Sequence, residues 1–259
     1  MRVRLTAAAY LASAGDGTPI TDFKARSELP DRKHLKMMTR DVRLGIAAIG
    51  RALDARPGWD DTAPERRGLF VGAATAASDP RDLAPSLRAA TQDGVFDVAA
   101  FGEVGIPRVP PLWLLEGLSN NIVGFATAYY DMRGINTNRC DGRIGGLAAV
   151  VDGARAIAEG RLDLAVAGGA DSLIAASGWL GRPAGEGSGF VVMESGDGPG
   201  PAIVGCGFSH GEPALHGPDY GAATGSIDLA RWVVDGGSGR LEITDEAGRI
   251  VWLEVAPGQ

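Results

Sequence analysis

Several residue types that mark large protein classes are scarce in this chain. Two of its 259 residues are cysteines, too few for a disulfide framework, and this scarcity suits a reducing, cytoplasmic compartment. Acidic residues outnumber basic ones by 32 to 25, whereas a nucleic-acid site needs a concentrated basic face. No apolar run reaches the roughly 20 residues of a membrane-spanning helix. We therefore expect neither nucleic acid nor a membrane as a partner.

Glycine and apolar residues are plentiful instead. The 39 glycines and the 45% apolar content suit an α/β protein with a substantial core, tight turns and close helix–sheet contacts. Apolar runs at 68–74 and 162–167 predict buried strands, and apolar residues recur at helical spacing over 143–160. Strands that alternate with helices predict a layered α/β fold. We expect a single domain over 1–259.

The beginning of the chain has two interpretations. Met1-Arg-Val-Arg, a short apolar stretch and the small residues up to Ala14 superficially resemble a secretory signal. Thr6 and Tyr10 interrupt that stretch, which is already short. We therefore favour a first buried strand over residues 3–12.

The remaining segments complete the expected pattern. Residues 112–132 and 221–234 each predict a helix, and a short polar strand is expected at 135–138. Apolar residues alternate on both sides of a turn at 245–248, which predicts a hairpin. We assign residues 236–259 to this C-terminal hairpin.

The most specific motifs lie between Arg133 and Ser195. A turn and strand over 133–142 lead into the helix at 143–160, and Ala167-Gly-Gly-Ala-Asp171 and Gly185-Glu-Gly-Ser-Gly189 follow. In order, wording and spacing these segments resemble a β-ketoacyl synthase of the thiolase-like superfamily. Further similarities extend the resemblance to about residues 3–235; they lie at Lys36–Arg40, Pro110–Gly134 and Gly207–His216.

The resemblance assigns a special position to Arg143. In the ketosynthase family a cysteine nucleophile sits at the start of the corresponding helix. Counting forward from Arg133-Gly134 and back from Ala167-Gly-Gly both put Arg143 there. An arginine stays protonated and cannot act as an acyl nucleophile. A cation at a helix N-terminus is also disfavoured by about 0.3–1 kcal/mol.

Three environments for Arg143 remain open at this stage. The side chain could be solvated in a decayed site, could form an ion pair at a dimer interface, or could bind a functional anion. Asp141 is one local candidate for an anionic partner.

The two cysteines are the alternative sources of a nucleophile. Cys140 lies three residues before Arg143, so a shift of about one helical turn in the alignment would make it the nucleophile. We expect Cys140 to be buried and inert instead, and Cys206, in an apolar segment, to lie in the core.

The family also uses two catalytic histidines, which its second half supplies. The three histidines of this chain are His34, His210 and His216, and none lies in a corresponding motif. A hairpin stands where the second half would continue. The resemblance therefore implies a thiolase-like α/β/α fold, mainly the N-terminal half of a ketosynthase with a C-terminal β-hairpin, and a site without the nucleophile or either histidine.

Two other kinds of site are weaker interpretations. Gly207-Phe-Ser209-His-Gly211 matches the G-x-S-x-G elbow of serine hydrolases. The elbow needs a helix directly afterwards, and the segment after Gly211 cannot supply one, so we expect a glycine-rich loop. His210, His216 and Asp219 match no common zinc spacing. We expect no metal and no cofactor.

The resemblance implies a non-catalytic subunit, similar in role to the chain length factors of type II polyketide or fatty-acid synthases. Its partner would be an active ketosynthase in a heterodimer, or a second copy in a homodimer, and an acyl carrier protein is a further candidate partner. One alternative is an active carrier-dependent acyltransferase or ketosynthase that uses Cys140 or partner residues. Another is a relict acyl-binding or regulatory module.

The expected partner surface comes from the same resemblance. In the family, the segments that correspond to 112–132 and 135–139 face the two-fold axis. A thiolase-like half leaves one layer uncovered, and exposed apolar surface of that size normally marks an interface. We expect the hairpin to cover part of that layer and a partner to cover the rest. The predicted interface residues are Trp113, Asn120, Asn121, Asn136 and Asn138.

Overall fold

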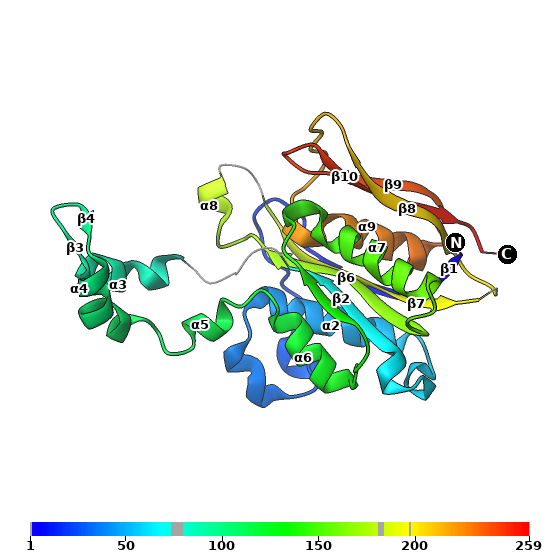
Figure 1. Cartoon of the computed structure of the whole chain (residues 1–259), viewed down its shortest axis with the longest axis horizontal. Helices are drawn as coiled ribbons and strands as arrows, with labels where there is room; N and C mark the ends of the chain where they lie inside the picture. Colours follow the sequence, from blue (N-terminus) through cyan, green and yellow to red (C-terminus); the bar gives the residue numbers. More distant parts are fainter. Residues whose placement is uncertain (1, 74–79, 181–183, 197, 259) are drawn as a thin grey trace.

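A mixed eight-stranded sheet forms the centre of the molecule (Figure 1). The computed structural model describes residues 2–73, 80–180, 184–196 and 198–258. The strand order is β5-β2-β6-β7-β1-β8-β10-β9, and a separate small ladder joins β3 and β4. The strands are β1 Val3–Ala12, β2 Arg67–Gly72, β3 Thr91–Gln92, β4 Val95–Phe96, β5 Asn136–Arg139, β6 Leu164–Ser172, β7 Glu186–Ser195, β8 Ala202–His210, β9 Gly239–Thr244 and β10 Arg249–Ala256.

Four longer helices cover the sheet. Helices α2 (Arg40–Asp54) and α6 (Asn121–Tyr130) pack on one face, and α7 (Gly145–Ala158) and α9 (Thr224–Asp235) pack on the other. The other helical segments are short: α1 Ala25–Glu28, η1 Arg32–Met37, η2 Trp59–Asp61, η3 Pro64–Arg66, η4 Pro80–Leu83, α3 Ala84–Ala89, α4 Val98–Ala100, η5 Phe101–Gly105, η6 Ile106–Arg108, α5 Trp113–Glu116, η7 Gly142–Ile144, α8 Ser177–Leu180 and η8 Gly221–Ala223.

The sheet bends sharply between β1 and β8. Among the described residues these two strands pair only at Val3–Ile203 and Arg4–Ala202, and β8 continues its pairing with β10. As a result β8, β10 and β9 form a second layer that lies over α7 and α9 (Figure 1). Leu241 of β9 and Leu253 of β10 belong to the same buried cluster as these helices. We call β8, β10 and β9 the second sheet.

The position of α7 between two β layers explains its composition. Most residues of α7 are buried, and many of them are glycine, alanine or valine. A Cβ atom at Gly146 would lie 2.3 Å from the carbonyl oxygen of Ala222, so the backbone of η8 reaches α7 only because residue 146 is glycine. Small side chains are therefore needed where the two helical segments meet.

Much of the expected pattern is confirmed. The beginning of the chain forms the strand β1, the run at 162–167 forms the buried strand β6, and the C-terminal hairpin is β9–β10. The expectation that this hairpin covers part of a layer did not name that layer; in the structure the hairpin packs on α7 and α9. No helix in the described part of the chain is both long and apolar enough to cross a bilayer.

The prediction of a single helix over 112–132 is wrong. The segment forms α5, a break, and then α6. The side chain of Asn121 donates from Nδ2 to the carbonyl oxygen of Leu115 at 2.6 Å. This bond gives a carbonyl at the end of α5 a partner outside the helix, and so favours termination there.

The prediction of a glycine-rich loop at 207–211 is also wrong for most of that segment. Residues up to His210 belong to β8, where Phe208 pairs with Val251 and His210 pairs with Arg249. The glycines signalled a loop, but β10 supplies regular backbone partners from a segment about forty residues further along.

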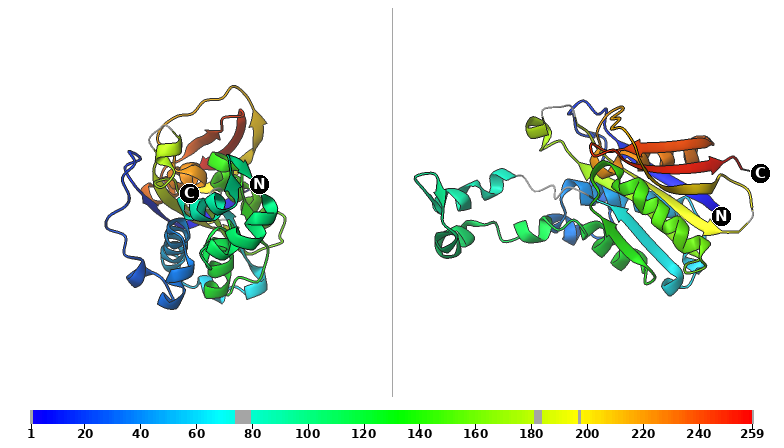
Figure 2. Two further views of the ribbon diagram at one scale, coloured as in Figure 1. Left: turned by 90° about the vertical axis from the view of Figure 1, so that its left-hand side faces the viewer. Right: turned by 45° about the horizontal axis from the view of Figure 1, so that its top comes forward.

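A slender projection leaves this layered body (Figures 1 and 2). It consists of residues 80–118 and contains η4, α3, the β3–β4 ladder, α4, η5, η6 and α5. We call residues 80–118 the arm. The right-hand view of Figure 2 shows its tip well away from the sheet and its helices.

Candidate functional site

Arg143 lies in the turn between the edge strand β5 and the helix α7. It belongs to η7, directly before the first residue of α7. Gly142 before it has a φ of +57°, which glycine adopts without strain. Arg143 is only 6% exposed, so it is not the solvated arginine that a decayed site would hold.

The partners of Arg143 come from a distant loop of the same chain. Its Nη2 donates to the backbone carbonyl of His216, and its Nη1 lies 3.7 Å from Oδ1 of Asp219. Asp141, the local candidate, instead pairs with Arg139 at 2.7 Å and with Arg249 at 3.5 Å. The anion that Arg143 meets in this structure is therefore Asp219.

Asp219 is fixed by the backbone around it. Its Oδ1 accepts from the Gly221 N–H at 2.9 Å, and its carbonyl oxygen accepts from the Gly185 N–H at 2.8 Å. Nearby, burial raises the pKa of the Asp228 carboxyl, and the Arg231 and Arg143 guanidinium groups oppose that rise. Arg143 thus acts as a buried cation that holds the start of α7 against the loop before η8.

A cavity of about 250 Å³ lies beside this arginine. It is below the usual size range of small-molecule pockets, roughly 300–1,000 Å³. Its lining contains one cation, one histidine and one carboxylate, and no thiol. The lining residues are Arg143, Ala214, His216, Glu242, Ile243 and Thr244.

The prediction that Cys140 is buried is wrong, because the thiol is exposed. β5 is the last strand on its side of the sheet, and the chain leaves that edge at Cys140. The thiol Sγ lies 3.4 Å from the carbonyl oxygen of Ala73 and 3.2 Å from Oγ of Ser119, either of which can take its one proton, and it accepts from Nδ2 of Asn138 at 3.3 Å. A carbonyl, a hydroxyl and an amide are not general bases for a thiol proton.

Cys206 packs against the core from β8 and is half-buried rather than fully buried. Burial raises the pKa of its thiol, although the Arg155 guanidinium opposes the rise. A raised pKa leaves less thiolate at neutral pH, so Cys206 is a poor nucleophile.

The histidines are spread over the molecule. His34 Nδ1 lies 2.7 Å from the hydroxyl of Tyr129, His210 is exposed on β8, and only His216 reaches the Arg143 cavity. Ser209 also lies within β8, opposite Ile250, so it does not form a nucleophile elbow. Within the described ranges, no group of three acids, cysteines or histidines could hold a metal ion.

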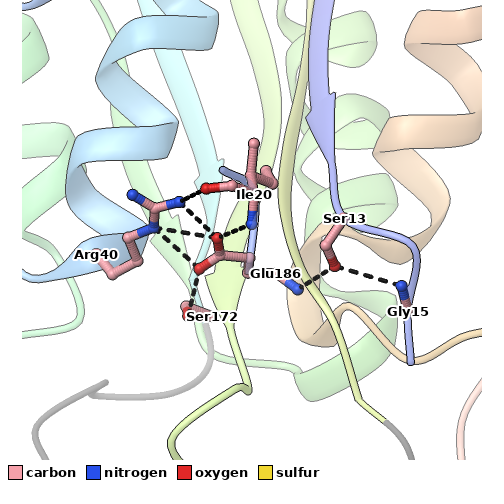
Figure 3. Close-up of polar contacts among 6 residues, drawn as sticks. All are labelled: Ser13, Gly15, Ile20, Arg40, Ser172 and Glu186. Carbon is pink, nitrogen blue, oxygen red and sulfur yellow. Dashed lines mark hydrogen bonds and ion pairs between the residues drawn. The ribbon is translucent and has the colours of Figure 1, made fainter. Parts of the chain in front are cut away.

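Glu186, in the second glycine motif, is the centre of a network that the sequence did not predict (Figure 3). Its carboxylate is buried and accepts from Arg40 at 2.6 Å, from the Ile20 N–H at 2.8 Å and from Ser172 Oγ at 3.0 Å. Its own N–H donates to Ser13 Oγ at 3.0 Å. These bonds connect β6, β7 and α2 with the residue directly after β1, and a carboxylate so fully occupied acts as a structural anchor rather than a base.

The five predicted interface residues come from three elements, β5, α5 and the start of α6. Asn136 and Asn138 belong to β5, which pairs only with β2 among the described strands, while Trp113 begins α5. Asn120 and Asn121 mark the start of α6. Nε1 of Trp113 and Oδ1 of Asn138 are buried without a hydrogen-bond partner.

Comparisons with known proteins point to one fold. No protein-family model and no curated protein sequence matches the chain. Many solved structures match, and the following three are matched over nearly all of both chains. The complex of a type II polyketide synthase acyl-carrier protein with its hexaketide-bound ketosynthase, AntDE:AntF, has a TM-score of 0.81 at 13% sequence identity, over 99% of this chain and 99% of that one. The ishigamide ketosynthase/chain length factor has a TM-score of 0.72 at 17% identity, again over 99% of each chain. A β-ketoacyl synthase from Burkholderia phymatum STM815 has a TM-score of 0.77 at 14% identity, over 100% of each chain.

Sequence identities this low support a shared fold but not a shared activity. The order of strands and helices, the helices α7 and α9 between two β layers, and the three matches all agree with the fold expected from the motifs. The chain has the thiolase-like fold of β-ketoacyl synthases and chain length factors.

Proposed function

We propose that this chain is a non-catalytic ketosynthase-like subunit that pairs with an active ketosynthase in type II polyketide or fatty-acid-type biosynthesis. One observation carries the proposal. The resemblance puts Arg143 at the nucleophile position, and in the structure Arg143 is buried and paired with Asp219.

The chemistry of condensation supports this proposal. A ketosynthase needs a thiolate, which the N–H groups and the dipole at a helix N-terminus stabilise. Arg143 cannot supply one, and its guanidinium already donates to the carbonyl of His216. An acyl–enzyme intermediate at this position is therefore excluded by the residue itself.

The free edge of the sheet supports pairing with another chain. The strand β5 exposes one edge, and an unpaired edge can add a strand from another subunit. In the family this segment faces the two-fold axis. Trp113, Asn120, Asn121, Asn136 and Asn138 form the proposed interface.

Co-expression tests the proposal. The chain is produced together with a ketosynthase from the same locus, with an affinity tag on the ketosynthase alone, and the purified material is analysed by native mass spectrometry. We expect a 1:1 complex. A ketosynthase homodimer accompanied by a free copy of this chain would contradict the proposal.

A further inference from the structure

A second cavity, of about 550 Å³, lies between α1, α2 and α6. The helices α2 and α6 lie side by side there, on the opposite face of the central sheet from α7 (Figure 1). Its volume falls within the range of small-molecule pockets, roughly 300–1,000 Å³. None of the five proposed interface residues lines it, so pairing with a ketosynthase does not account for this cavity.

Part of the cavity wall is apolar. Leu29, which follows α1, and Ala47 of α2 both line the cavity, and they are 7% and 1% exposed. Pro30 adjoins them in the lining. A hydrocarbon group placed against this wall would leave water, which favours binding in proportion to the apolar area covered.

The hydroxyl of Tyr130 forms a polar part of the same wall. A Cβ atom at Gly50 would lie 2.6 Å from this hydroxyl, so a larger residue at position 50 would displace the tyrosine ring. Burial first, and then the Asp54 carboxylate, raise the pKa of Tyr130 to about 12. The hydroxyl therefore keeps its proton at neutral pH, and its oxygen can accept a hydrogen bond.

The charged groups of the lining leave an excess of negative charge. Arg51 pairs with Glu28 at 2.6 Å, whereas Asp54 has no ion-pair partner among the described residues. Asp54 is also the last residue of α2, and the dipole at a helix C-terminus favours a cation over an anion. The Asp54 carboxylate and the end of α2 would therefore both attract a cation into the cavity.

We propose that this cavity binds an organic ammonium ion. The hydrocarbon part of the ligand lies against the apolar wall, and its N–H groups donate to the Asp54 carboxylate and to the Tyr130 hydroxyl. An ammonium group has three N–H donors and no acceptor, which suits these two oxygen acceptors. An organic anion does not fit, because the one cation of the described lining, Arg51, already pairs with Glu28. This inference goes beyond the proposed function and does not depend on a ketosynthase partner.

The first test compares hexylammonium, hexanol and hexanoate, which share a six-carbon chain and differ in the charge of the head group. Each probe is titrated against the whole chain at neutral pH, and binding is followed by saturation-transfer NMR. We expect hexylammonium to bind about fivefold more tightly than hexanol, because a partly solvated charge contact is gained. Hexanoate should bind most weakly of the three.

The second test locates the site with matched variants. Asp54→Asn removes the proposed carboxylate, and Asp235→Asn is the control, because Asp235 is the last residue of α9 and is also exposed. We expect Asp54→Asn to weaken hexylammonium binding about fivefold and Asp235→Asn to leave it unchanged. Tyr130→Phe should weaken it as well. Thermal unfolding of each variant shows that the fold is retained.

Several outcomes would overturn the inference. Equal binding of hexylammonium and either other probe would mean that the cavity does not recognise a cation, and no binding by hexylammonium would mean that there is no such site. Equal losses in Asp54→Asn and Asp235→Asn would reveal a general charge effect instead of a site.

The source of the ammonium group is read from one further probe, Nα-acetyl-lysine amide. Tighter binding of this probe than of hexylammonium would identify a lysine side chain of another protein as the occupant, and weaker binding would identify a free amine; either result supports the site. None of these titrations contains a ketosynthase, so failure of the proposed function would leave their outcome unchanged.

Discussion

At the start of α7, the charge of one residue decides what chemistry the site can support. A helix N-terminus favours an anion, and a cation there costs about 0.3–1 kcal/mol. Arg143 offsets that cost through Asp219 and the carbonyl of His216. The result is an ion pair at the position where the family places a thiolate.

Removal of the Arg143 cation should lower the free energy of unfolding. We expect Arg143→Met to reduce the free energy of unfolding by about 3 kcal/mol, because one member of a buried ion pair is lost while its volume is roughly kept. Urea denaturation at neutral pH measures the change. The control is Arg161→Met, which removes only a surface pair with Glu159 and should cost less than about 1 kcal/mol. Equal effects of the two substitutions would mean that the Arg143 pair has no structural role.

The sequence predicted the position of Arg143 but not its surroundings. Asp219 approaches through a loop that no local pattern joins to α7, so spacing alone pointed to Asp141. Glu186 was part of a recognised motif, yet its partner Arg40 comes from a distant helix. The exposure of Cys140 was missed because it depends on where the sheet ends, which is a property of the whole strand order.

At the scale of elements, the second sheet has two different faces. Leu241, Val251 and Leu253 point into the core beneath it, while Arg240, Glu242 and Glu254 are exposed. This alternation has the period of a strand with one buried face, and it allowed the hairpin to be predicted from sequence. The extension of β8 could not be predicted, because its pairing partner is set by the fold.

A pair of neighbouring substitutions in β10 tests this two-faced arrangement. Leu253 is fully buried, so Leu253→Ala should cost about 2–5 kcal/mol of unfolding free energy through lost burial and a cavity. Glu254→Ala, one residue on and exposed, should change it by no more than about 0.5 kcal/mol. Thermal and urea unfolding of both variants give the comparison. Similar losses would show that β10 does not cover the helices as described.

At the scale of the whole molecule, the layers explain where a partner can bind. The helices α7 and α9 are covered on both sides, by the central sheet and by the second sheet. The layer that we expected a partner to cover is therefore largely closed by the chain itself. Eight of the thirteen exposed large apolar residues of the described chain lie instead on the arm. Fold class followed from short motifs, whereas this distribution required the arrangement of all elements.

Acylation of the purified complex tests the central proposal most directly. The complex of this chain with its ketosynthase is incubated with acyl- and malonyl-loaded carrier protein, and both chains are weighed by intact mass spectrometry. We expect an acyl adduct on the ketosynthase and none on this chain. An acyl adduct on this chain that disappears in the Cys140→Ala variant would contradict a non-catalytic role and make Cys140 the nucleophile.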